Sequence, residues 1–226
     1  MGKKEWKAIK KKRTFSNMIT GFFNDDSKFM TFIGRVALLA SANVCWLVCS
    51  LPAVTGGAAL IALYTVLLER KEQTYDTAFK RFFQVFAKTL LPSLPLWLLT
   101  LGVGTALATA WRIVLRENLT DHFFLLAPLL LASAVMAIAL LWLFPLLASG
   151  ETSWREALPA AFLLGLRELG RSLLLLLLEG AGVLLAACCF TASLTLTGIW
   201  LLFGFAVIAW GKLLIMEGVL EKWSNH

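Results

Sequence analysis

The sequence predicts an all-α, polytopic helical membrane protein with about six transmembrane helices. Hydrophobic residues make up 59% of the 226 residues and charged residues only 15%, whereas a soluble domain carries about 25% charged residues. The mean hydropathy is +0.77. The hydrophobic residues also gather in runs of about 20 residues, the length a helix needs to cross the hydrocarbon core. We therefore expect a basic cytoplasmic segment at residues 1–28 and a single transmembrane domain at residues 29–226.

The basic N-terminal segment carries seven of the 21 Lys and Arg residues within its first 13 positions. Basic residues beside a membrane bind anionic lipid headgroups. The segment does not have the form of a signal peptide, because the apolar core would begin late and would contain Arg35. We expect the segment to remain in the cytoplasm and to bind the anionic headgroups of the lipid bilayer, with the Arg35 side chain extending back to the same headgroups.

Six apolar runs follow, each compatible with a helix that crosses or enters the bilayer. They are residues 29–51, 53–68, 90–115, 123–147, 172–194 and 199–219. The second run is slightly short and contains Gly56 and Gly57 near its start, so it is either a short tilted helix or a re-entrant segment. The sequence therefore leaves two topologies for the domain. One has six spans, and the other has five spans plus a re-entrant segment.

The positive charges outside these runs predict the orientation. With six spans, 17 Lys and Arg residues fall on one side, and two, Arg112 and Arg116, fall on the other. Loops rich in Lys and Arg stay in the cytoplasm. We therefore expect both termini in the cytoplasm, and the turn at 51–55 and the loop at 116–122 on the opposite side.

Two segments between the runs are predicted to lie along the cytoplasmic surface as amphipathic helices. Residues 77–89 place phenylalanines at spacings of three and four, and residues 154–171 place charges around an apolar middle. The phenylalanines are Phe79, Phe82, Phe83 and Phe86. The two interfacial helices divide the domain into hairpins at 29–68, 90–147 and 172–219.

A shift of 79 positions aligns the two interfacial segments with each other, together with the runs that follow them. It places Phe162 opposite Phe83 and Ser172 opposite Ser93. This pattern is consistent with an internal duplication of an interfacial helix followed by a hairpin.

Glu179 is the best candidate for a functional residue, because it lies inside the fifth run. An ionisable side chain there costs about 2.5–3.5 kcal/mol on insertion scales unless it faces protein or water. It is either a proton or cation site or a neutral, hydrogen-bonded side chain; in the second, favoured case, Glu179→Gln would be nearly silent. We expect Lys212, in the last run, to extend to the headgroups. Alternatively, Lys212 pairs with Glu179 if their two runs pack as a hairpin.

Asn43 and Thr55 complete the candidate polar site within the membrane. An amide such as Asn43 in a transmembrane helix more often forms a helix-to-helix hydrogen bond than binds a ligand. The histidines, His122 and His226, do not suggest a catalytic triad, and the four cysteines lack neighbouring metal ligands. We expect no catalytic residue, no metal, no cofactor and no nucleic-acid partner, and the oligomeric state is not predicted.

A helical hairpin at residues 43–64 is the most distinctive stretch. Pro52 ends its first helix, because proline lacks an amide donor and restricts the preceding residue. Small residues around Gly57 begin the second helix and permit close packing. The motif consists of Asn43, Trp46, Ser50, Leu51, Pro52, Thr55, Gly57 and Tyr64. Together with the phenylalanine-rich basic segment that follows, it resembles the YesL family of bacterial integral membrane proteins, although Gly56 stands where a branched apolar residue is expected.

The resemblance covers residues 43–98 and implies a multi-pass protein of the bacterial cytoplasmic membrane. Members of this family have no known function and are often encoded beside sugar-uptake transporters and two-component sensors. The resemblance therefore implies an accessory or assembly role in carbohydrate uptake or sensing, with a sugar transporter or a sensor membrane protein as partner. The alternative is a small transporter or channel with a polar site near Glu179 and the Gly56–Gly57 break. We do not expect an enzyme.

Overall fold

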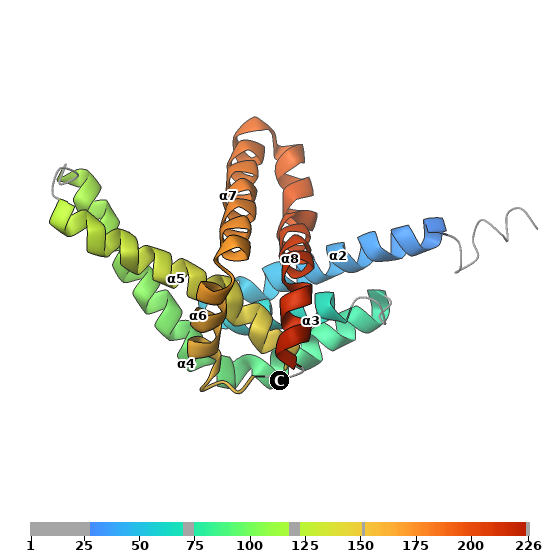
Figure 1. The fold of residues 1–226 in the computed structure, drawn as a ribbon. Helices are drawn as coiled ribbons and strands as arrows, with labels where there is room; N and C mark the ends of the chain where they lie inside the picture. The colour runs from blue at the N-terminus through green and yellow to red at the C-terminus, as the bar shows by residue number, and fades with distance from the viewer. Residues whose placement is uncertain (1–27, 70–74, 118–122, 151, 225–226) are drawn as a thin grey trace, which may run out of the picture.

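The described part of the chain is all-helical (Figure 1). The computed structural model describes residues 28–69, 75–117, 123–150 and 152–224. Five of its helices are long and apolar enough to cross a membrane, over Ile33–Ser50, Thr77–Arg116, Leu126–Ser149, Leu169–Ala192 and Leu194–Met216. The predicted all-α polytopic fold is therefore confirmed. The N-terminal segment up to residue 27, and residues 118–122 of the predicted outer loop, lie outside the described residues.

Helices α2 (Lys28–Ser50) and α3 (Gly56–Leu68) pack together as the predicted hairpin. A short 3₁₀ helix, η1 (Ala53–Thr55), connects them after Pro52. The Thr55 hydroxyl lies 2.5 Å from the carbonyl oxygen of Cys49 and 2.8 Å from that of Pro52. Its single proton can be donated to either carbonyl, so Thr55 closes the turn.

Helix α3 forms the centre of the fold. It has 13 residues and is about 20 Å long at 1.5 Å per residue, shorter than the roughly 30 Å hydrocarbon core. Of its residues, all but Leu60 and Leu68 are buried, and it packs against α2, α4, α5 and α8. A helix that is apolar on every side belongs in a core. The structure therefore confirms that the second run is a short helix, and it is compatible with both predicted alternatives for that run, a short tilted crossing and a re-entrant segment.

Helix α4 (Tyr75–Arg116) joins two elements that were predicted to be separate, the interfacial helix at 77–89 and the run at 90–115. Its 42 residues would extend roughly 60 Å if straight. Figure 1 shows that its ribbon changes direction part-way along. Pro92 and Pro95 lie inside the helix, and proline bends helices because it removes a backbone hydrogen bond. The predicted boundary thus corresponds to a proline-containing bend.

The predicted phenylalanine stripe of α4 divides between the core and the surface. Phe82 is fully buried and stacks on Phe86 at a ring distance of 6.3 Å. Phe79 and Phe83 are exposed, and their rings lie 4.9 Å apart. One face of this segment therefore packs on the core, while the other presents aromatic rings to the surroundings, as an interfacial helix does.

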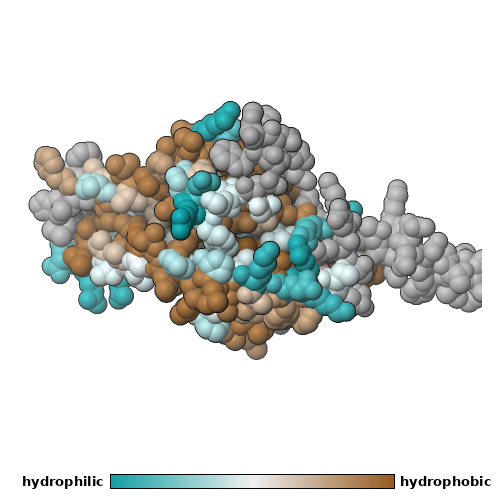
Figure 2. All heavy atoms as spheres, turned by 90° about the horizontal axis from the view of Figure 1, so that it is seen from below, coloured by the Kyte–Doolittle hydropathy of each residue, from teal (hydrophilic) through white to brown (hydrophobic). Residues whose placement is uncertain are grey.

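The remaining helices complete a hairpin with α4, form a second hairpin, and include the short helix that connects the two. They are α5 (Phe123–Ser149), α6 (Ala157–Arg167), α7 (Leu169–Ala192) and α8 (Leu194–Ser224). Figure 1 shows the α4–α5 and α7–α8 hairpins diverging as two arms. Figure 2 shows that the face seen from below is largely hydrophobic, with hydrophilic residues in separate patches.

Burial agrees with the predicted repeat of 79 positions at two pairs of residues. Ala78 and Ala157 are both buried, and so are Ser93 and Ser172. The helix order also recurs. The first part of α4 corresponds to α6, the second part of α4 to α7, and α5 to α8. The second copy differs in that the helix is interrupted at Glu168. The internal duplication therefore stays a prediction with which these two pairs and the helix order agree.

Candidate functional site

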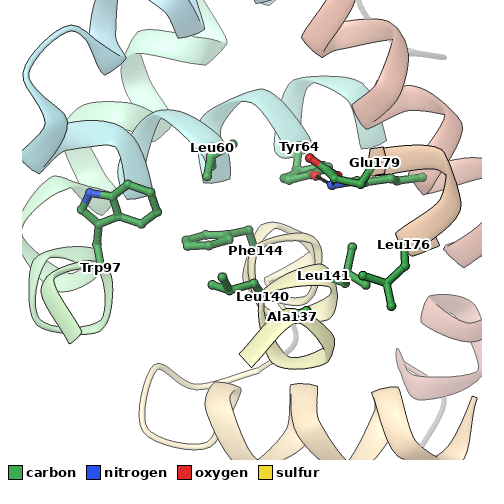
Figure 3. Close-up of a pocket in the computed structure, with 10 residues that line it drawn as sticks. Leu60, Tyr64, Trp97, Ala137, Leu140, Leu141, Phe144, Leu176 and Glu179 are labelled. Carbon is green, nitrogen blue, oxygen red and sulfur yellow. Dashed lines mark hydrogen bonds and ion pairs between the residues drawn. The ribbon is translucent and has the colours of Figure 1, made fainter. Parts of the chain in front are cut away.

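Three helices bring polar side chains together at one point inside the bundle. Lys212 of α8 forms an ion pair with Glu179 of α7. The Lys212 ammonium nitrogen also donates a hydrogen bond of 3.4 Å to the hydroxyl oxygen of Tyr64, on α3. Figure 3 shows the Tyr64 and Glu179 side chains side by side.

Lys212 is buried and points into the protein rather than toward the headgroups. The expectation that it extends to the membrane surface is therefore wrong, and the alternative of a pair with Glu179 is correct. A charge within the membrane is stable only when it faces protein, water or an opposite charge. The pair satisfies this requirement for both residues, and 43% of the Glu179 side chain remains exposed.

Two glycines allow α7 and α8 to approach closely enough for this pair. A β-carbon on Gly182 would collide with the Ile208 side chain, and one on Gly211 would lie 3.2 Å from a methyl carbon of Leu178. Small residues commonly line such close helix contacts in membranes. Because Gly211 adjoins Lys212, the close contact and the ion pair occur at the same level of the hairpin.

A pocket of about 340 Å³ opens beside the ion pair. Helices α3, α4, α5, α7 and α8 all contribute to its lining, which consists of Leu60, Tyr64, Trp97, Ala137, Leu140, Leu141, Phe144, Leu176, Glu179 and Lys212. Figure 3 shows Glu179 and Tyr64 toward one end and Trp97 toward the other, with Phe144 between them. The pocket is therefore apolar along most of its length and polar at one end.

Trp97 is a pocket residue that the sequence did not single out. Its indole nitrogen donates to the carbonyl oxygen of Ala53 at 2.6 Å, and its ring is 5.6 Å from that of Phe144 in an edge-to-face arrangement. A β-carbon on Gly56 would lie 2.8 Å from a ring atom of Trp97, and one on Gly57 would lie 2.8 Å from the Trp97 β-carbon and 2.9 Å from the ring. The two glycines are therefore not a break in a helix but the space into which Trp97 fits.

Asn43 connects the first and last spans and does not line the pocket. Its amide nitrogen donates to the carbonyl oxygen of Leu201 at 2.6 Å, and its amide oxygen accepts from the backbone nitrogen of Ala206 at 2.8 Å. The expected helix-to-helix hydrogen bond is confirmed. Since Asn43 serves this contact and Thr55 closes the α2–α3 turn, the structure does not bring either residue to Glu179.

The other motif residues belong to the α2–α3 hairpin but face different surroundings. Trp46 packs on Phe205 of α8 at a ring distance of 4.2 Å, while Leu51 and Pro52 are exposed at the turn. Tyr64 alone among the motif residues lines the pocket. Within the described part of the chain, no three His, Cys, Asp or Glu side chains are grouped so that they could hold a metal ion.

Comparison with known families gives a match over part of the chain. The sequence model of a family described as a protein of unknown function, DUF624, matches residues 39–111, from α2 into α4. That family includes YesL-like proteins. The match contains the motif hairpin and Trp97 but covers less than half of the chain. No curated protein and no solved structure matches the chain.

Proposed function

We propose that this protein is a non-enzymatic accessory or assembly subunit of the bacterial cytoplasmic membrane, with both termini in the cytoplasm. The main support is the exposure of its arms. Only 11% of the spanning part of α7 is buried within the chain, and Leu177 and Leu184 are 62% and 68% exposed. Such a surface is covered by lipid or by the helices of a second membrane protein, and the proposal assigns part of it to a partner.

The inventory of polar groups favours this role over transport. A transporter places several polar side chains at mid-depth, often beside broken helices. Here Asn43 and Thr55 are engaged in structural hydrogen bonds, and Gly56 and Gly57 accommodate Trp97. Of the polar site that the transport hypothesis requires, Glu179 remains, but the Gly56–Gly57 break does not.

Carbohydrate uptake or sensing is the process we propose for this subunit. The support is the resemblance of the hairpin at 43–64 to YesL proteins, whose genes often neighbour those of sugar transporters and sensors. The partner would then be a sugar transporter or a sensor membrane protein.

Site-specific photocrosslinking in the native host tests the proposal. A benzophenone amino acid would replace Leu177 or Leu184 on α7, with Val48 on α2, which is 58% exposed, as the control position. We expect both α7 positions to capture the same membrane protein and the control not to capture it. Lipid adducts alone at all three positions would contradict the accessory role. Capture of a membrane protein unrelated to sugars would contradict the carbohydrate assignment but retain the accessory role.

A further inference from the structure

The pocket beside Tyr64 has the dimensions and composition of a ligand site. Its volume of about 340 Å³ falls within the roughly 300–1,000 Å³ typical of small-molecule sites, which are mostly apolar with a few convergent polar groups. Of its lining residues, only Lys212 and Glu179 carry a charge. Their charges cancel, so the polar end of the pocket is neutral overall.

This neutrality determines which head group the pocket accepts. An anionic group bound to Lys212 would compete with Glu179, and a cationic group bound to Glu179 would compete with Lys212. Either event leaves one charge in a low-dielectric site without its partner, which is strongly unfavourable. An uncharged polar group avoids this cost.

The hydrogen-bonding groups at the polar end match a hydroxyl. An ammonium group has three donors, and among the described residues Glu179 and Tyr64 account for two of those on Lys212. Glu179, whose side chain is 43% exposed, still offers carboxylate lone pairs to the pocket. A hydroxyl both donates and accepts, so it can bind the two charged residues without separating them.

The rest of the pocket suits an aliphatic chain. Leu60 and Leu140 line it beside Phe144, between the polar end and Trp97. Because α4, α5, α7 and α8 all contain apolar segments long enough to span a membrane, the surrounding bilayer is the natural source of such a ligand.

We propose that this pocket binds an uncharged, single-chain amphiphile with a hydroxyl-bearing head group, of the monoacylglycerol type. The head group lies against Tyr64, Glu179 and Lys212. The acyl chain extends along Leu60 and Phe144 toward Trp97. This binding site does not depend on the accessory role.

Photolabelling of the full chain in phosphatidylcholine nanodiscs tests the proposal. Three probes share one diazirine-bearing acyl chain and differ in the head group: a monoacylglycerol, a fatty acid and a fatty amine. We expect the monoacylglycerol to label the pocket segments around Leu60 and Leu140 roughly tenfold more than either charged probe, a ratio that corresponds to about 1.4 kcal/mol. Excess unlabelled monoacylglycerol should suppress this labelling but not that of the exposed leucines of α7.

Two matched variants locate the site. Ala137→Phe fills the pocket and should abolish the selective labelling, whereas Ala134→Phe, on the exposed side of the same helix, should leave it intact. Glu179→Gln leaves Lys212 as an uncompensated cation and should reverse the preference in favour of the fatty acid. Three results would overturn the proposal. They are equal labelling of the wild-type chain by the three probes, labelling of the wild-type chain that unlabelled monoacylglycerol does not suppress, and undiminished labelling of a folded Ala137→Phe variant.

Discussion

Lys212 on α8 and Glu179 on α7 form an ion pair that also lines the pocket between the helices. Lys212 is buried, so its charge depends on Glu179 for compensation. The sequence alone suggested a neutral Glu179 whose replacement by glutamine is nearly silent. The pair reverses that expectation, because glutamine would leave Lys212 without a counter-charge.

Asn43 should stabilise the bundle by connecting α2 to α8. Asn43→Leu removes two interhelical hydrogen bonds and should lower the free energy of unfolding by about 1–2 kcal/mol, measured by titrating micelles with a denaturing detergent. Ser41→Ala is the control, since among the described residues that hydroxyl bonds only to the carbonyl oxygen of Leu38 in its own helix. Equal losses in the two variants would contradict a specific role for Asn43.

Gly57 should be required because of Trp97. A β-carbon there would lie 2.8 Å from the Trp97 side chain, so Gly57→Ala should destabilise the fold by about 1–3 kcal/mol. Gly102→Ala is the control, since no atom outside its own helix lies within 4 Å of its β-carbon position. The cost of Gly57→Ala should shrink in a Trp97→Leu background, and an unchanged cost would show that the clash lies elsewhere.

The predicted orientation can be measured at two exposed positions. Glu117 follows α4, and Ser153 lies between α5 and α6. With the four native cysteines replaced, Glu117→Cys should react with a membrane-impermeant thiol reagent in intact cells, whereas Ser153→Cys should react only after permeabilisation. The opposite pattern would place the termini outside the cytoplasm.

Local patterns in the sequence predicted the helices but only part of their packing. The α2–α3 turn was predictable because Pro52 and the small residues after it act locally. The continuity of α4 was not predictable. Pro92 and Pro95 are typical of a helix end, but a long apolar helix can also bend at proline and continue. The central position of α3 also depends on its neighbours, although its apolar character on every side was a usable signal.

The pocket residues were also only partly predictable, because some of them have a local signal in the sequence and others depend on how the helices pack. Glu179 is conspicuous because a carboxylate in an apolar run is costly, and Lys212 was considered as its partner. Tyr64 and Trp97 have no comparable local signal, because an aromatic residue in an apolar run is common in membrane helices. Their roles follow from α3 and α4 packing against each other.

The dependence of Lys212 and Glu179 on each other is tested most directly by a double-mutant cycle on the free energy of unfolding. Glu179→Gln or Lys212→Met alone should each cost about 3 kcal/mol, the lower end for buried pairs because Glu179 is 43% exposed. Arg81→Gln, which breaks the more exposed pair with Glu69, is the control and should cost less than about 1 kcal/mol. The double variant Glu179→Gln, Lys212→Met should return close to the wild-type stability, because no unpaired charge remains. A double variant whose loss equals the sum of the two single losses would contradict the pair.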